Sequence, residues 1–441
     1  MITCRFRIAT TLGAVLLVPL TALAQPVAMP LTLDEAVSRA VASSHRVAES
    51  MARNDGAAAV VAGRHAATRP QVVAVGGYTR TNHVDQFGIL LPNNTLRVIY
   101  PDIPDNARAR LDVQWPIYTS GRLQAIEAAA RLDQTAAGRD VSTTEADVRL
   151  DVARAFWGLV VATESERVVG ESLARMGEHL RDVRNQLEAG LLPPNDVLTT
   201  QAQEARQRML SIQARATREM AEADLARLVA APNGSRITPV AVMDAPRVDA
   251  ALDTLVADAL AARSERKALT DRIAAAESRQ RAASAGKRPT VSLAGGVDYA
   301  RPNPRIFPRL ADWRESWDAG VNVAWSLFDG GKTKAELAEA SANVHALRAR
   351  LAEFDSVVAL DIRQRLSEIE SSRAALDAAD VAVQATAEAR RVVGERFNAG
   401  VATATDVVDA QVAQLQAALD RTQAIASARL AEARLNRALG K

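Results

Sequence analysis

The sequence predicts a mainly helical protein that also carries transmembrane β-strands, with the same structural unit built twice in one chain. Three observations predict this fold class. The 441-residue chain opens with an export signal, long regions without proline follow short aromatic-rich segments, and the second half repeats the first. Aromatic residues make up 4% of the chain while apolar residues make up 48%, a composition typical of long, closely packed helices.

Residues 1–24 have the pattern of a cleaved signal peptide. Two arginines precede an apolar stretch from Ile8 to Leu20, and Ala22-Leu23-Ala24 offers a small-residue cleavage site. The only cysteine, Cys4, lies upstream of that site, so we expect neither disulfides nor an acyl anchor in the mature chain. No later stretch reaches about 18 uninterrupted apolar residues, so export leads either to a soluble protein or to an outer-membrane β-barrel.

Composition argues against several classes of function. With 54 basic and 52 acidic residues the chain has no general basic surface, so nucleic acid is not an expected partner. We expect no metal site, no cofactor and no enzyme activity, because no catalytic set of side chains converges and the five histidines lack ligand spacing. These histidines are His45, His65, His83, His179 and His345.

The chain contains an internal repeat. A shift of 210 residues aligns the two halves without a gap from Trp115 to the end, and upstream the offset becomes 219, so one hairpin loop is longer in the first half. The matched landmarks include Trp115 with Trp325, Gly121 with Gly331, Leu150-Asp151 with Leu360-Asp361, Asp196 with Asp406, and Arg69-Pro70 with Arg288-Pro289. We therefore divide the mature chain into a first repeat at 25–231, a linker at 232–250 and a second repeat at 251–441.

Proline placement predicts the helices. All 17 prolines lie outside 117–192, 195–231 and 309–441, and proline inside a helix removes a hydrogen bond. In each half we expect a shorter helix before the strands, one continuous long helix, a glycine that ends it, and a second helix of a coiled-coil hairpin. The expected segments are 32–67, 122–188, Gly190 and 195–230 in the first half, and 251–286, 332–398, Gly400 and 403–439 in the second.

Two segments in each half predict paired transmembrane strands. Residues 108–118 and 317–328 alternate apolar and polar side chains, and their expected partners are 71–80 and 290–300. We expect Trp115, Tyr118, Val323, Trp325 and Leu327 to face lipid or an interfacial aromatic girdle. An ordinary soluble sheet packed on helices is the alternative. Four strands cannot close a membrane barrel, so a barrel requires an oligomer.

These features are joined by motifs that resemble one family. Over essentially all of its mature length the chain resembles the TolC-like outer membrane efflux proteins. The motifs that carry the resemblance are Leu31-Thr32-Leu33-Asp34-Glu35-Ala36, Arg69-Pro70, Trp325-Ser326-Leu327-Phe328-Asp329-Gly330-Gly331, Phe397-Asn398-Ala399-Gly400 and Thr405-Asp406-Val407-Val408-Asp409-Ala410-Gln411.

The resemblance implies a homotrimer with a twelve-stranded β-barrel in the outer membrane, joined to an α-helical barrel that extends into the periplasm. It further implies an exit duct of a tripartite efflux system, with a periplasmic membrane fusion protein as adaptor and an inner-membrane pump as partners. The alternatives are the channel of type I protein secretion or, in another class, a soluble periplasmic coiled-coil adaptor. The sequence does not identify the cargo.

The resemblance also suggests site residues at the periplasmic end. It places Asp406, Asp409 and Asp196 at a periplasmic constriction, where crowded like charges are expected to raise carboxylate pKa values. It places Gly190, Gly400 and Phe397 at hairpin tips that contact the adaptor. Ala402 stands where the family's best-studied type has an arginine, so we do not expect that type's closing salt bridge. An aspartate near a helix start also serves as an ordinary cap, which is the alternative for all three.

Overall fold

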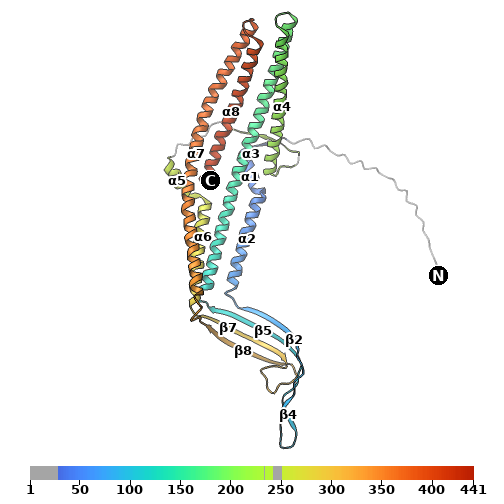
Figure 1. The fold of residues 1–441 in the computed structure, drawn as a ribbon, viewed down its shortest axis with the longest axis vertical. Coiled ribbons are helices and arrows are strands. Elements are labelled where there is room, and N and C mark those ends of the chain that lie inside the picture. Colours follow the sequence, from blue (N-terminus) through green and yellow to red (C-terminus); the bar gives the residue numbers. More distant parts are fainter. Residues whose placement is uncertain (1–27, 233, 242–250) are drawn as a thin grey trace, which may run out of the picture.

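The computed structural model describes residues 28–441 except 233 and 242–250. The predicted signal peptide therefore lies outside the described residues. The molecule is elongated, with helical hairpins running away from one end of a curved antiparallel sheet and two loops at the other end of the sheet (Figure 1).

The four long helices show the duplication directly. Helices α3 (Arg122–Glu188) and α7 (Lys332–Asn398) have 67 residues each, and α4 (Pro194–Leu228) and α8 (Ala404–Ala438) have 35 each. Every boundary of α3 and α4 recurs 210 residues later in α7 and α8. At 1.5 Å per residue the longer helices extend about 100 Å.

The helix that precedes each pair of strands is interrupted, where the sequence predicted one continuous helix. Helices α1 (Leu33–Ser43) and α2 (His45–Ala66) break at Ser44, and α5 (Leu252–Ala262) and α6 (Ser264–Ser284) break at Arg263. Both break residues have extended backbone, with ψ near +120°. The offset of 219 residues relates them, so the interruption is part of the repeated unit.

The main sheet has the strand order β2-β5-β7-β8, all antiparallel. Strand β5 of the first repeat pairs with β7 of the second, so the two repeats share one sheet, and β2 and β8 are its edges. The strands are β2 (Gln71–Arg80), β5 (Asp105–Tyr118), β7 (Thr290–Arg301) and β8 (Arg314–Ala324). Strand β8 ends four residues before the predicted 328, because the chain already turns there toward α7.

Sequence patterns missed four short strands. A hairpin of β3 (Phe87–Leu90) and β4 (Leu96–Tyr100) extends the loop between β2 and β5, which accounts for the change of offset between the repeats. Strands β1 (Ala28–Leu31) and β6 (Arg236–Pro239) pair in parallel, so part of the segment expected as a linker is a strand. Strands of four or five residues are too short to show a reliable alternation.

A left-handed turn joins sheet to helix in each repeat. Gly121 and Gly331, one residue before α3 and α7, have φ of 82° and 91°, a region that side chains with a Cβ rarely adopt. This requirement explains why a glycine recurs at this point in both halves.

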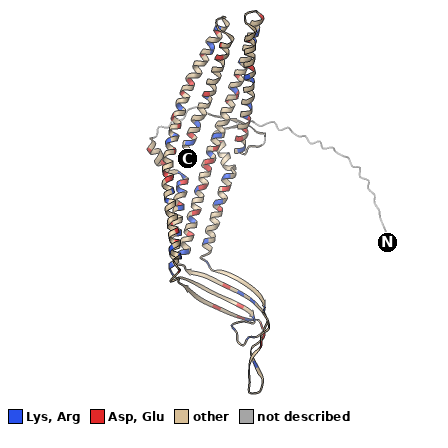
Figure 2. Cartoon of the chain, viewed as in Figure 1, with Lys and Arg blue, Asp and Glu red and all other residues tan. Residues whose placement is uncertain are grey.

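Apolar packing runs along the helices as several separate clusters. One joins α1, α3 and α4 around Leu31, Phe156 and Leu225, and another joins α5, α7 and α8 around Val358 and Ile362. Charged residues are spread along the helices and are sparse on the strands (Figure 2). Among the described residues, no helix is both long and apolar enough to cross a membrane.

Candidate functional site

One face of the sheet carries a network of ion pairs. The strand register places Arg110, Asp298, Asp112 and Asp318 on the same face of β5, β7 and β8. The Arg110 guanidinium bonds Asp112 (Nε–Oδ1 2.6 Å) and reaches Asp318 (2.9 Å) and Asp298 (3.6 Å), so one side chain connects three strands. Arg108 adds a bidentate pair to Asp298, which is almost fully buried. Buried charges require such pairing, so this face is polar.

The opposite face is apolar. The register aligns Leu111 with Val297 and Trp317, and Trp115 with Leu293 and Val321, across the same three strands. Apart from the partly buried Leu293, these side chains are largely exposed in the single chain, as are the predicted lipid-facing residues Tyr118, Val323, Trp325 and Leu327. Trp325 and Leu327, however, follow the end of β8 at Ala324, so they lie in the turn toward α7 and outside the strand where they were expected.

Two of these aromatics anchor the sheet to the helices. The indole N–H of Trp115 donates to the carbonyl of Thr68 (3.2 Å), and that of Trp325 donates to the carbonyl of Lys287 (3.1 Å). The acceptors are related by the offset of 219 residues and the donors by 210, so the same anchor is built twice. An indole ring, with a polar N–H and an apolar ring surface, suits a membrane–water interface.

At the far ends of the hairpins, two glycines terminate the long helices. Gly190 and Gly400 have φ of 73° and 72°, and the next residue, Leu191 or Val401, donates its N–H back to the carbonyl of Gln186 or Arg396 (2.8 Å each). This is a Schellman C-cap, which reverses the chain within a few residues. The two glycines end the long helices because the cap requires a positive φ at their positions.

The two hairpin tips start their second helix differently. Thr403 caps α8 with a capping box, in which the Asp406 carboxylate accepts from the N–H and the hydroxyl of Thr403 (2.8 Å each). The repeat-related Asp196 lies in the first turn of α4, but that helix begins with Pro193-Pro194 and has no side-chain cap. Asp409 is exposed one turn beyond Asp406.

Within one chain the pKa of the Asp406 carboxyl is lowered, while the rise expected from crowded like charges in a trimer stays a prediction. Hydrogen bonds from the backbone N–H of Thr403 and then from its hydroxyl, with a smaller contribution from the positive charge of Arg396, lower the pKa of the Asp406 carboxyl. The capping alternative is therefore realised in the structure for Asp406. It does not remove the charge from the tip, because a carboxylate with a lowered pKa stays ionised at neutral pH.

Phe397 lies near the tip, but its ring faces inward. Its side chain is 6% exposed and packs with Val183 of α3 and with Ala404 and Val407 of α8. The prediction that this ring contacts an adaptor is corrected: in this conformation it holds the first hairpin against the second. The ring is buried because the two hairpins converge here and surround it with apolar side chains.

His179 of α3 completes this contact and was not singled out as a site residue. Its ring meets Phe397 edge to face at 5.2 Å between centroids, and its Nε2 lies 3.3 Å from the carbonyl oxygen of Ala404. Burial lowers the pKa of the His179 imidazole, although the Ala404 carbonyl and the negative charge of Asp182 act in the opposite direction. No alternation or motif marks this position, so only the packing reveals it.

Ion pairs brace the helix breaks in both repeats. Arg46, just after the break at Ser44, pairs with Asp151 of α3 (2.7 Å), and Arg263 at the second break pairs with Asp361 of α7 and donates to the carbonyl of Ala438 (2.5 Å). Asp151 and Asp361 are the aspartates of the repeated Leu-Asp landmark. Their recurrence in both halves marked the two aspartates in the sequence, but it did not show which arginines they pair with.

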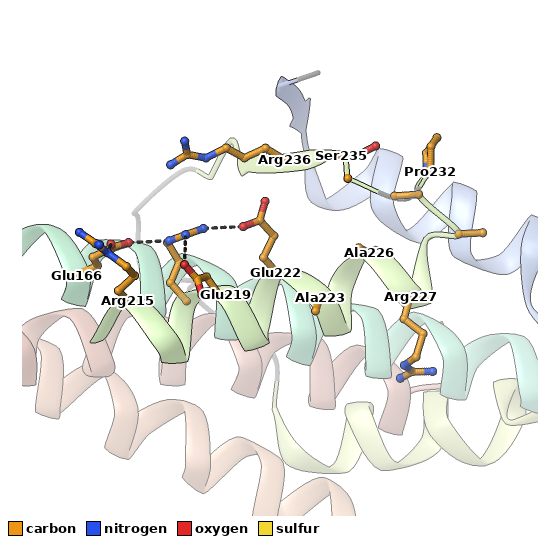
Figure 3. Close-up of a pocket in the computed structure, with 14 residues that line it drawn as sticks. Glu166, Arg215, Glu219, Glu222, Ala223, Ala226, Arg227, Pro232, Ser235 and Arg236 are labelled. Atoms are coloured by element: carbon orange, nitrogen blue, oxygen red, sulfur yellow. Dashed lines mark hydrogen bonds and ion pairs between the residues drawn. The ribbon is translucent and has the colours of Figure 1, made fainter. Parts of the chain in front are cut away.

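A polar groove of about 960 Å³ lies beside the β1–β6 pair (Figure 3). Arg218 of α4 joins Glu166 of α3 (2.6 Å) to Glu222 (2.5 Å), and Glu222 accepts the backbone N–H of Ile237 in β6 (2.7 Å). These contacts fasten the short strand pair to the helices. Within the described residues, no group of three or more histidine, cysteine or acidic side chains is placed to hold a metal ion.

Comparison with known proteins connects this architecture to a family. The family model described as outer membrane efflux protein matches residues 36–231 and 255–441. Outer membrane protein TolC of Vibrio cholerae is 25% identical over 393 residues, covering 86% of this chain and 83% of the relative. The crystal structure of the CmeC outer membrane channel of Campylobacter jejuni aligns with a TM-score of 0.78 at 16% identity, covering 92% of this chain and 85% of that one. That of VceC from Vibrio cholerae aligns with a TM-score of 0.76 at 18% identity, covering 92% and 96%.

The family match and the relatives place this chain among outer-membrane channel proteins, which are not enzymes. The chain belongs to the outer membrane efflux protein family, since the family model matches most of its length. Its place is the outer membrane, and its long helices extend into the periplasm.

Proposed function

We propose that this protein is the outer-membrane exit duct of a tripartite efflux system, working as a homotrimer with a periplasmic adaptor and an inner-membrane pump. The observation that carries the proposal is a four-stranded sheet with one apolar and one charged face and two unpaired edges, continuous with helices of 67 residues.

The sheet supports closure by other copies of the chain. Within the described part of the chain, edges β2 and β8 lack partners on their outer sides, and each unpaired backbone group in lipid costs several kcal/mol. Three copies of the sheet, with β8 of one beside β2 of the next, give a twelve-stranded barrel. The apolar face with Leu111, Val297 and Val321 then contacts lipid, and the ion-paired face lines the lumen.

The helices support the same assembly. Helix α4 exposes an apolar stripe of Leu198, Met209, Ile212 and Met220, at spacings made of steps of three and four residues. On α7, Val381 and Val392 are likewise exposed beside a row of alanines. In a trimer the α4 stripe of one copy packs against the α7 stripe of its neighbour and closes a helical barrel. Stripes at heptad-like spacing suit this coiled-coil contact.

The hairpin tips form the periplasmic end in this proposal. Asp406 and Asp409 of three copies come together as acidic rings, with Asp196 beside them, and acidic rings favour cations over anions. Gly190 and Gly400 shape the tips that an adaptor engages. Phe397 acts behind that surface by joining the two hairpins. Because position 402 is an alanine, the closed state of this channel does not use an arginine there. The positive charge that acts on Asp406 comes from Arg396.

Assembly is the direct test. We expect the protein to fractionate with the outer membrane and to run as a heat-sensitive trimer in mild detergent, because closure of the sheet requires other copies. Cross-linking in cells to the periplasmic membrane fusion proteins of the host tests the partner. A soluble periplasmic monomer contradicts the barrel. A trimer that never cross-links to any adaptor contradicts the tripartite role alone. The type I secretion alternative shares the duct and differs in the pump, which the cross-linked complex identifies.

A further inference from the structure

The loop between β7 and β8, residues 302–313, folds back over the charged face of the sheet. We call it the outer strap. Asn303, which is 2% exposed, donates to the carbonyl of Arg314 (2.9 Å) and to the hydroxyl of Ser316 (3.0 Å). Arg305 pairs with Asp318 (2.8 Å) and donates to the carbonyl of Trp317 (2.7 Å). Ser316 and Asp318 are on the same face of the sheet as Arg110, so the strap starts on the charged side.

The outer strap then crosses the sheet toward its opposite edge. The guanidinium of Arg309 donates to the hydroxyl of Tyr100 in β4 (2.8 Å) and lies 5.0 Å from the centre of its ring. Pro302, Pro304 and Arg309 also close a groove of about 310 Å³ over Gly77 and Thr79 of β2. The register places both β2 residues opposite Arg108 and Asn106, again on the charged face. The strap therefore spans the sheet from β8 to β2.

The position of the strap has a consequence for the channel. Ion-paired arginines and aspartates do not face lipid, so the face that the strap covers is the lumen of the barrel. The strap lies at the end of the sheet away from the helices, which is the external end (Figure 1). Its tip exposes Phe307, an apolar side chain with 71% of its surface accessible in the single chain.

We propose that the three outer straps form a second constriction at the external mouth, latched by the Arg309–Tyr100 contact. The inference rests on the proposed function, because it takes the charged face as the lumen of a trimer. The latch joins two loops from different strand pairs, so its opening moves the strap without breaking the sheet. Arg309 is then a residue that limits passage at the exit, separate from the acidic tips at the entrance.

Access to the lumen from outside the cell tests the latch independently of the periplasmic end. With Cys4 removed in the predicted signal peptide, Asn322→Cys introduces a single thiol on the charged face, about 26 Å below the start of β8 at 3.3 Å per residue. Val321→Cys places a matched thiol on the apolar face. A sulfonated dye maleimide that does not cross the outer membrane is added to intact cells, and its labelling rate is measured.

We expect Asn322→Cys to be labelled slowly and Arg309→Ala to increase its rate about tenfold, since a charged hydrogen bond with a cation–π contact is lost. Tyr100→Ala should act alike, and Arg97→Ala, which removes a nearby charge from β4, should not. An unchanged rate in both Arg309→Ala and Tyr100→Ala overturns the strap. Equal labelling at Asn322→Cys and Val321→Cys instead overturns the assignment of the lumen, and with it the proposed barrel.

Discussion

At the scale of single residues, two aspartates three positions apart have different physical roles. Asp406 is tied into the cap of α8 by Thr403, whereas Asp409 is exposed and has no such bond among the contacts of the described residues. A charge that is also a cap cannot be removed without changing the start of the helix. The sequence could place both on one side of the tip, but only the side-chain geometry separates them.

We therefore expect Asp409→Asn to be the clean probe of the acidic ring. It should lower cation selectivity and weaken block by multivalent cations while leaving protease resistance of the tips unchanged. Asp406→Asn should change both properties, and Thr403→Ala should change protease resistance alone. Single-channel recording in planar bilayers, paired with limited proteolysis, measures the two effects. Unaltered selectivity in Asp409→Asn removes that residue from the conduction path.

At the scale of structural elements, most helices could be predicted because proline and glycine mark their ends. The 67-residue helices followed from proline-free stretches, and Gly190 and Gly400 marked their ends. The breaks at Ser44 and Arg263 were not predicted, because no proline or glycine marks them: Ser44 caps α2 by accepting the N–H of Val47, and Arg263 pairs with Asp361 of α7. The buried contact of His179 with Phe397 is equally a product of distant packing.

The start of α7 offers a test of capping with a defined pH range. Asp329 accepts from the N–H groups of Gly331 (3.0 Å) and Thr333 (2.9 Å) and from the Thr333 hydroxyl. These bonds, the Thr333 hydroxyl first, lower the pKa of Asp329 to about 2. Since the folded pKa lies below the ordinary 3.8, the stabilisation is complete above pH 3.8 and is lost as pH falls through about 2.

We accordingly expect Asp329→Ala to raise amide hydrogen exchange in the first turn of α7 at neutral pH. The parent protein should approach the protection of the variant only near pH 2, after correction for the intrinsic rate of exchange. Asp329→Thr is the matched control, because Thr119 occupies the equivalent position before α3 and accepts the N–H of Leu123 (3.3 Å). Equal protection in Asp329→Ala and the parent at pH 7 contradicts the capping role.

At the scale of the whole molecule, one sheet must satisfy lipid on one side and water on the other. The alternation in sequence predicted the two faces, and the register extends it across β5, β7 and β8: Leu111, Val297 and Trp317 share one face, and Arg110, Asp298 and Ser316 the other. In a single chain the apolar side chains are largely exposed and most of the charged ones are partly or fully buried, so exposure alone does not distinguish lipid from lumen. Chemistry and register do, because the network of charges that joins three strands lies on one face, whereas the other face carries a single cross-strand pair, Arg80–Asp105, at the outer ends of β2 and β5.

The last prediction tests this assignment at neighbouring positions of β8. Val321→Arg places a charge on the apolar face three residues before the end of the strand and should impair trimer insertion by roughly 2–4 kcal/mol if it reaches the bilayer midplane. Val323→Arg should cost less, about 0–1 kcal/mol, because the strand ends one residue later, at Ala324, near an interface. Asn322→Arg, between them but on the charged face, should insert and assemble normally.

The measurement is the yield of heat-sensitive trimer in outer-membrane fractions at matched expression. The order Val321, Val323, Asn322 in decreasing severity follows from depth and face together. A smooth gradient along the strand without the recovery at Asn322 argues for a soluble sheet and against a membrane barrel.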